Sequence, residues 1–324
     1  MFNLQEIRRA HEIVLGALRP SSALSWPLID ERVGAEVVVK HENHLPTGAF
    51  KVRGGLTYVD ALIKREPETR GLISATRGNH GQSLAFAAKR AGLQVTILAP
   101  QGNSTEKNAA MRALGAELIE FGRDFQAARE EAMRLASLRG LHPVPSFHRD
   151  LVLGVSTYAL ELLSERPDLD VLYVPIGQGS GICGCISARD ALGLKTEIVG
   201  VQSTEAPAYS LSFAAGRPVP TSSADTLADG MATRLPDQEA LEVILKGATR
   251  IVLVSDDEVA AAVRAYWTDT HNLAEGAGAA GLAAAVKERS RLRGRKIGLV
   301  LSGGNIDFDL FRRWVRVAPN AVAA

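Results

Sequence analysis

The sequence predicts an α/β protein in which parallel strands are joined by helices. From about residue 35 onward, short runs rich in β-branched residues alternate with Ala/Leu-rich stretches of helical length. Such alternation is typical of parallel strands that are linked by crossover helices. At 324 residues and 46% hydrophobic composition, the chain is long enough to bury a core in about two lobes.

The elements follow in order from local patterns. Apolar side chains recur at helical spacing over residues 4–18, before the 20–22 region breaks the pattern, and predict an opening helix. Apolar or β-branched runs predict strands at 36–40, 71–74, 95–99, 117–121, 171–176, 197–202, 250–254 and 296–301. The predicted helices between them include 81–91, 105–114, 125–139 and 257–267, and the Ala/Gly-rich stretch 275–285 starts another.

The strands between roughly residues 50 and 150 form a compact βαβα run that can make its own sheet. We therefore expect a small domain over residues 50–149. Residues 1–49 and 150–324 would form the large domain around it.

Charge and cysteine content exclude several classes of function. The chain has 37 basic and 36 acidic residues and no basic cluster interleaved with aromatics, so neither nucleic acid nor a membrane is expected as a partner. Its two cysteines, Cys183 and Cys185, cannot build a disulfide framework or a zinc site. The N-terminal stretch has no apolar core of signal-peptide length, so we expect a soluble cytoplasmic protein.

The segment KHENHLPTGAFKVRGG, residues 40–55, begins as a strand, crosses a Pro/Gly turn and enters a helix with Lys51 near its start. A lone lysine in a first helical turn is usually a surface residue. A desolvated lysine, however, has a lowered pKa and can act as a Schiff-base nucleophile.

A second candidate is the glycine-rich loop PIGQGSGICG, residues 175–184, which follows an apolar strand. Small residues before a helix let backbone N–H groups converge on a phosphate, although a tight turn without a ligand is the alternative. The pattern Gly179-x-Gly181-x-x-Gly184 is also typical of loops that bind a nicotinamide dinucleotide, which is a second alternative. Gln202 stands where that site would need an acidic residue, and the lysine segment would stay unexplained.

Two more loops, residues 74–82 and 302–305, follow predicted strands. Ligands of open α/β sheets bind at such carboxyl ends. Each loop alone is weak evidence because Asn and Ser are common in caps and turns, and a histidine such as His80 is more often a packed residue.

Together these segments resemble the fold type II pyridoxal-phosphate enzymes of the threonine/serine dehydratase and serine racemase family, over nearly the whole chain. Five motifs carry the resemblance in the family's order: TGAFKVRGG, GNHGQ, GQGSG, TLADG and SGGN. The resemblance implies a two-lobed fold like that of the tryptophan synthase β subunit, with a mostly parallel sheet in each lobe.

The resemblance also implies roles for individual residues. Lys51 would hold pyridoxal 5'-phosphate as a Schiff base and act as general base, Asn79 would bind the cofactor's 3'-hydroxyl, and Ser302 its pyridine nitrogen. The phosphate would be bound by Gly177, Gln178, Gly179, Ser180 and Gly181. The substrate would contact the loop of Ser74, Thr76, Arg77, Gly78 and His80.

The implied activity is dehydration of a small β-hydroxy amino acid such as L-threonine or L-serine. The aminoacrylate released would hydrolyse to a 2-oxo acid and ammonia, and the family's habit suggests a homodimer. Three alternatives stay open: a bulkier or acidic substrate such as phenylserine or 3-hydroxyaspartate, another β-elimination or β-replacement, and a non-catalytic relative, against which the intact Lys51, Asn79 and Ser302 count.

The chain departs from the family pattern in two places. Arg77 stands where serine racemase-like members have a serine base, so racemisation is not expected. Arg77 would bind a substrate carboxylate or point outward to a surface acid. Gln202 and Ala208 occupy the acidic positions of metal-binding relatives, with Glu205 displaced, so no magnesium or calcium site is expected.

Overall fold

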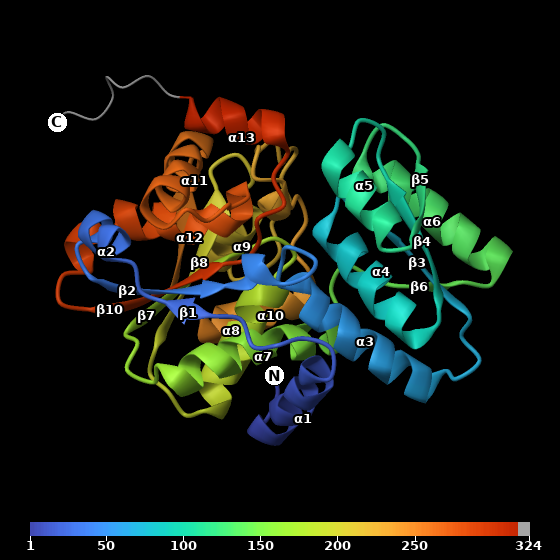
Figure 1. Cartoon of the computed structure of the whole chain (residues 1–324), viewed down its shortest axis with the longest axis horizontal. Helices are drawn as coiled ribbons and strands as arrows, with labels where there is room; N and C mark the ends of the chain where they lie inside the picture. The colour runs from blue at the N-terminus through green and yellow to red at the C-terminus, as the bar shows by residue number, and fades with distance from the viewer. Residues whose placement is uncertain (317–324) are drawn as a thin grey trace.

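A computed structural model describes residues 1–316 and contains two sheets, each covered by helices on both faces (Figure 1). The larger sheet has six strands in the order β1-β2-β10-β7-β8-β9, and only β1 runs antiparallel to its neighbour. Its strands are β1 (Ala23–Leu24), β2 (Glu36–His41), β7 (Val171–Pro175), β8 (Glu197–Ser203), β9 (Arg250–Val254) and β10 (Lys296–Leu301).

The smaller sheet is wholly parallel, with the order β5-β4-β3-β6. Its strands are β3 (Gly71–Ala75), β4 (Gln94–Ala99), β5 (Glu117–Glu120) and β6 (His142–Pro143). This sheet and its helices lie to the right in Figure 1, beside the larger sheet. All four strands fall inside the predicted small domain, whose boundaries at 50 and 149 stay a prediction.

Helices pack on the faces of the two sheets. One face of the larger sheet is covered by α2 (Pro27–Val33), α11 (Asp256–Thr270), α12 (Gly276–Lys287) and α13 (Phe308–Val315), and the other by α7 (Arg149–Glu165), α8 (Ser180–Ala191), α9 (Ala208–Ala215) and α10 (Gln238–Gly247). The smaller sheet packs against α4 (Asn79–Ala91) and α5 (Thr105–Ala113) on one face and α6 (Phe125–Arg139) on the other. Two further helices, α1 (Leu4–Leu15) and α3 (Lys51–Arg65), lie between the lobes, where α3 contacts both α4 and α7.

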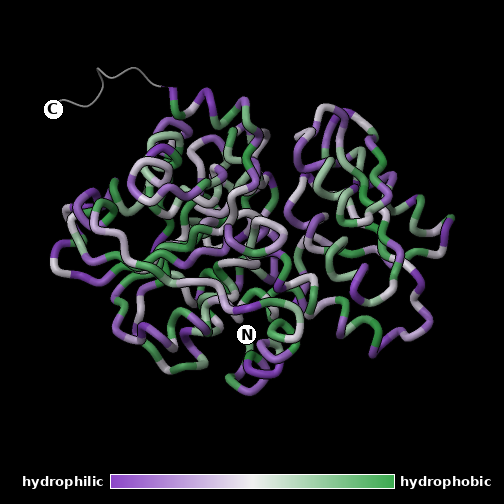
Figure 2. The backbone as a smooth tube through the Cα atoms, in the orientation of Figure 1, coloured by the Kyte–Doolittle hydropathy of each residue, from purple (hydrophilic) through white to green (hydrophobic). Residues whose placement is uncertain are grey.

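The core of each lobe lies on both faces of its sheet, which explains the strand sequences. In β2, Val37 and Val39 belong to the core on one face and Val38 to the core on the other. Strands buried on both faces therefore read as continuous apolar runs rather than as alternating ones. Figure 2 shows this pattern, with hydrophobic segments inside the lobes and hydrophilic ones on the outer helices.

All eight predicted strands are present, with small shifts at their ends. The opening helix ends earlier than predicted, at Leu15, and the Gly16 N–H donates to the Glu12 carbonyl in its last turn. The helix predicted from residue 81 begins at Asn79. The two-residue strands β1 and β6 were not predicted, since so short a pairing leaves no periodic pattern. No helix in residues 1–316 has the length and apolar character needed to span a membrane.

Candidate active site

Lys51 is the first residue of α3, and the turn before it is fixed by backbone hydrogen bonds to the loop after β10. The Phe50 N–H donates to the Ser302 carbonyl at 3.0 Å, and the Gly304 N–H donates to the Gly48 carbonyl at 2.9 Å. The predicted lysine segment and the SGGN loop are thus held together although about 250 residues separate them.

The Lys51 amine points towards the glycine-rich loop, where its Nζ donates to the Ser180 hydroxyl at 3.0 Å. Burial lowers the pKa of Lys51 to about 8, although the nearby Glu275 carboxylate raises it. Desolvation favours the neutral amine. About a tenth of Lys51 is therefore unprotonated at pH 7, and the neutral amine is the form that a nucleophile or base requires.

Arg53 anchors the first turn of α3 in the large lobe. It is fully buried, and its guanidinium donates to Glu42 and to Glu161, both at 2.7 Å. The two carboxylates outweigh burial and raise the pKa of Arg53. Sequence analysis did not single out this residue, although it lies inside the TGAFKVRGG motif. Its contacts fix the orientation of the helix that carries Lys51.

The glycine-rich loop between β7 and α8 has the form of an anion cradle. Within the described part of the chain, the backbone N–H groups of residues 177–181 donate no hydrogen bond. Gly179 has φ +100°, and a Cβ on Gly177 would lie 2.3 Å from the Gly230 carbonyl oxygen. The twelve-residue helix α8 begins directly behind the loop, at Ser180. Free N–H groups at a helix N-terminus bind phosphate well.

Asn79 connects the two lobes through its amide. Its Nδ2 donates to Glu275 Oε1 at 2.6 Å, and its Oδ1 accepts from Asn305 Nδ2 at 2.8 Å. Asn305 also donates to the Thr47 carbonyl at 2.8 Å. The lysine turn, the asparagine loop and the SGGN loop thus meet at one point. One Asn79 N–H has no acceptor among residues 1–316 and is free to donate to a ligand.

A buried charge cluster lies beside Asn79 and was missed by sequence analysis. The Lys107 amine contacts Asp229 at 2.6 Å and Glu275 at 3.4 Å. Burial would lower the pKa of Lys107, but the two carboxylates outweigh it and raise the pKa. Asp229 lies in TLADG, to which no role was given, and Glu275 opens the Ala/Gly-rich stretch that was interpreted only as a helix start.

Of the five residues predicted to contact substrate, three turn inward. The Ser74 hydroxyl donates to the Val144 carbonyl at 2.8 Å, and the Thr76 hydroxyl accepts from the Gly78 N–H at 3.1 Å. His80 is buried, and burial together with nearby Lys51 lowers its pKa to about 3, so its ring is neutral at physiological pH. A substrate contact through these side chains stays a prediction.

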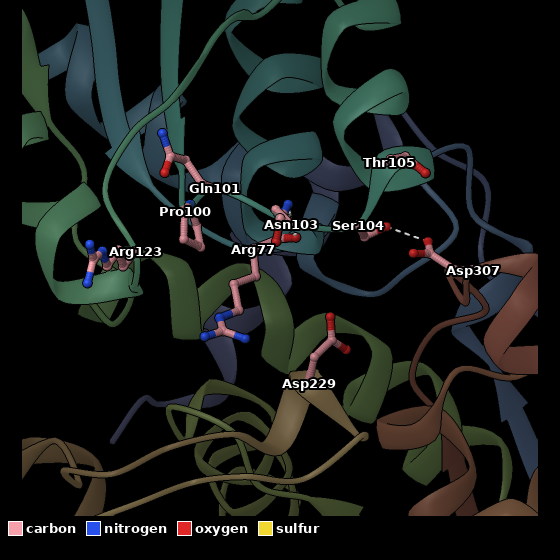
Figure 3. A pocket seen from close by; sticks show the side chains of 10 residues that line it. Arg77, Pro100, Gln101, Asn103, Ser104, Thr105, Arg123, Asp229 and Asp307 are labelled. Carbon is pink, nitrogen blue, oxygen red and sulfur yellow. Dashed lines mark hydrogen bonds between the residues drawn. The ribbon is translucent and has the colours of Figure 1, made fainter.

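Arg77 instead is exposed and lines a cleft of about 430 Å³. The small lobe supplies most of the wall, and the large lobe supplies Asp229 and Asp307. Figure 3 shows the Arg77 side chain projecting into the space between Arg123 and Asp229. The outward interpretation of Arg77 required a surface acid as partner, and none of the described acidic residues pairs with it.

The positions that bind metal in some relatives have other contacts here. Gln202 Oε1 accepts from the Ser210 N–H at 2.8 Å, and Ala208 is the first residue of α9. The absence of a metal site stays a prediction.

These residues fit pyridoxal phosphate. The site offers a partly neutral lysine amine, a run of free N–H groups for the phosphate and one free amide N–H on Asn79. Ser302 is buried, and its hydroxyl has no hydrogen-bond partner in the part of the chain that the structure describes, so it is available to a ring nitrogen.

Comparison with known proteins agrees with this fit. Residues 14–303 match the family model described as pyridoxal-phosphate dependent enzyme. The L-threonine ammonia-lyase of Thermotoga maritima is 33% identical over 97% of this chain and 78% of its own length. The L-threo-3-hydroxyaspartate ammonia-lyase of Saccharomyces cerevisiae is 32% identical over 89% of this chain and 88% of its own.

A solved structure has the same fold. The processed form of threonine deaminase isoform 2 from Solanum lycopersicum superposes with a TM-score of 0.89 at 27% identity, over 98% of this chain and 95% of its own. The family match decides against the nicotinamide alternative and confirms the resemblance drawn from the five motifs. The chain belongs to the pyridoxal-phosphate-dependent enzymes, with the two-lobed fold type II architecture.

Proposed function

We propose that this enzyme dehydrates a small β-hydroxy amino acid, such as L-threonine or L-serine, to a 2-oxo acid and ammonia. The observation that carries the proposal is the partly neutral Lys51 amine, held 3.0 Å from the Ser180 hydroxyl at the mouth of an N–H cradle. The names of the similar proteins, which are ammonia-lyases, support the same reaction class.

We assign the cofactor contacts as follows. The N–H groups of Gly177, Gln178, Gly179, Ser180 and Gly181 bind the phosphate, Asn79 donates to the 3'-oxygen, and the Ser302 hydroxyl binds the ring nitrogen. When bound, pyridoxal phosphate supplies an electron sink for the bonds at the substrate's Cα. A hydroxyl at Ser302 does not keep the ring nitrogen protonated as a carboxylate would. The sink is therefore weaker, which favours loss of the β-hydroxyl.

Lys51 moves the proton at Cα. With a pKa near 8, its amine is neutral often enough to accept that proton and basic enough to hold it. The α-carboxylate of the substrate binds at the N-terminus of α4, where the N–H groups of Asn79 and His80 donate no hydrogen bond to any described residue. His80 stays neutral behind them and contributes no charge.

The test is a visible spectrum followed by a substrate panel. We expect a yellow protein that releases equal amounts of ammonia and 2-oxo acid from at least one of L-serine, L-threonine, 3-hydroxyaspartate and phenylserine. The Lys51→Ala variant should lose at least about 10³-fold in kcat/KM, because one residue serves as both base and nucleophile. A protein that stays colourless with added cofactor, or a Lys51→Ala variant with substantial turnover, would refute the proposal.

The cytoplasmic location and the homodimer expected from the resemblance are also proposals. Light scattering of the purified protein should give twice the 34.6 kDa chain mass. A monomer mass would exclude the dimer without affecting the proposed reaction.

A further inference from the structure

We propose that Arg77 and Arg123 bind a second carboxylate of the substrate, so that the preferred substrate class is an acidic β-hydroxy amino acid of the 3-hydroxyaspartate kind. This inference rests on the proposed function and specifies its substrate. It is carried by the cleft between the lobes, by the charges on its walls and by the place of Arg77 in the chain.

The cleft lies where ligands of parallel sheets bind. Arg77 is in the loop after β3, residues 100–105 follow β4, and Arg123 is in the loop after β5. These three strands are neighbours in the smaller sheet, so their carboxyl ends meet along one edge. The large lobe closes the cleft from the other side through Asp229 and Asp307.

The guanidinium groups in this cleft are available to an anion. Neither Arg77 nor Arg123 makes a side-chain hydrogen bond or an ion pair with any residue in 1–316, whereas the acids on the opposite wall are engaged. Asp229 contacts the Lys107 amine at 2.6 Å, and Asp307 accepts a hydrogen bond from the Ser104 hydroxyl. Asp229 shares the Lys107 amine with Glu275, whereas the two arginines have no carboxylate partner among the described residues.

The backbone at Arg77 is fixed while its side chain is free. The Arg77 carbonyl accepts from Asn103 Nδ2 at 3.0 Å, and the next N–H, of Gly78, is bonded to Thr76. Arg77 is two residues before Asn79, so their Cα atoms are at most about 7 Å apart. The Arg77 backbone therefore lies close to the start of α4, where the α-carboxylate of the substrate is proposed to bind.

The guanidinium groups of Arg77 and Arg123 favour a carboxylate as the ligand of this cleft. A guanidinium offers paired N–H donors that match the two oxygens of a carboxylate, and such charged hydrogen bonds are stronger than neutral ones. The methyl group of threonine makes no hydrogen bond to a guanidinium. A carboxylate on Cβ would pair with the two guanidinium groups that have no other partner among the described residues.

The decisive experiment compares selectivity between substrates. We expect the wild-type enzyme to have a higher kcat/KM for 3-hydroxyaspartate, in its threo or erythro form, than for L-threonine. Arg77→Gln should lower that preference roughly 10- to 100-fold, the value of a lost charged hydrogen-bond pair. Arg77→Lys should restore part of it, and Arg123→Gln should have a smaller effect of the same sign. Arg8→Gln, an exposed arginine on α1, serves as the matched control.

Three results would overturn the assignment. Equal losses for threonine and 3-hydroxyaspartate in Arg77→Gln would mean that Arg77 binds the α-carboxylate instead. A wild-type preference for threonine would remove the need for a second anion site. A preference for O-phospho-L-serine over 3-hydroxyaspartate would assign the arginines to phosphate.

Binding of a compound that cannot react tests the anion site independently of the proposed reaction. In calorimetry on the protein as purified, L-malate should bind more tightly than L-lactate, and Arg77→Gln should remove the difference. If no hydroxy amino acid releases ammonia while malate still binds through Arg77, the proposed reaction fails and the anion site stands. If malate binds no better than lactate and wild type turns over threonine, the anion site fails and the reaction stands.

Discussion

Two loops of this protein both connect a parallel strand to a helix, but one is closely packed around its backbone and the other presents an exposed side chain. The loops between β7 and α8 and between β3 and α4 both follow a parallel strand and open a helix. In the first, a Cβ on Gly177 or Gly179 would meet a backbone oxygen at 2.3 Å or a methyl carbon at 2.7 Å. In the second, Arg77 is exposed, and the nearest atoms to a Cβ on Gly78 belong to the Lys107 side chain, at 2.5 Å from its Cδ, and not to backbone.

Under the proposed function, the difference separates the loop that binds the cofactor from the loop that meets the substrate. A loop that binds an anion through its backbone N–H groups needs glycine, and the phosphate proposed to bind there is the same whatever the substrate. A loop that presents side chains can change its ligand by one substitution. We therefore expect substitutions in the first loop to damage folding and cofactor binding, and those in the second to change selectivity.

Of the substitutions that test this difference between the loops, Gly179→Ala should lower stability and cofactor affinity the most. Alanine at φ +100° costs about 1–2 kcal/mol, and its methyl group would lie 2.7 Å from the Ala240 Cβ. Overpacking of this kind adds about 1–3 kcal/mol. Urea unfolding of the cofactor-free protein should show the combined loss, and cofactor titration should show weaker binding because the N–H groups are displaced.

Gly193→Ala is the matched control for that variant. Gly193 lies just after the end of α8 with φ +66°, and nothing lies within 4 Å of its added Cβ. Only the backbone cost of about 1–2 kcal/mol should appear, with cofactor affinity unchanged. If both variants lose the same stability and neither loses cofactor affinity, the cradle interpretation of the loop is wrong.

Sequence analysis predicted the loop between β7 and α8 more completely than the loop between β3 and α4, for a physical reason. Strands buried on both faces and glycines before a helix leave local patterns, so all eight strands and the GQGSG loop could be located. The contacts that orient Asn79 come from Asn305 and Glu275, about 200 residues away. No local pattern encodes such a contact. Arg77 was noticed only because it departs from the family motif.

Glu275→Gln tests whether the side-chain network tunes Lys51. The Glu275 carboxylate raises the pKa of Lys51 against burial. Removing its charge should therefore lower that pKa below 8. The rate of cofactor uptake by the cofactor-free protein follows the fraction of neutral lysine amine, so its midpoint should be near pH 8 in wild type and at lower pH in the variant.

The exposed carboxylate Glu205 provides the control for that measurement. Glu205→Gln removes a negative charge from the large lobe, and we expect the midpoint to stay near pH 8. A midpoint near 10.5 in wild type would show that Lys51 is not desolvated. A rise in Glu275→Gln would show that the carboxylate acts on Lys51 in some other way than by its charge.

The smallest effect is expected where the loop between β4 and α5, which also lines the Arg77 cleft, meets the large lobe. Ser104 caps α5 by accepting from the Lys107 N–H at 3.0 Å, and its hydroxyl donates to Asp307 just before α13. Loss of a helix cap costs about 1 kcal/mol, so Ser104→Ala should lower the free energy of unfolding by about that amount.

Asp124→Ala is the control: it removes the cap of α6, which accepts from the Ala127 N–H at 2.9 Å, and should lower the free energy of unfolding by about as much. The two variants should differ in hydrogen exchange at the Phe308 N–H of the large lobe, which donates to Glu106 Oε1 of the small lobe at 2.8 Å. Faster exchange in Ser104→Ala alone would show that the cap also holds the lobes together, whereas equal exchange in both variants would limit Ser104 to capping its own helix.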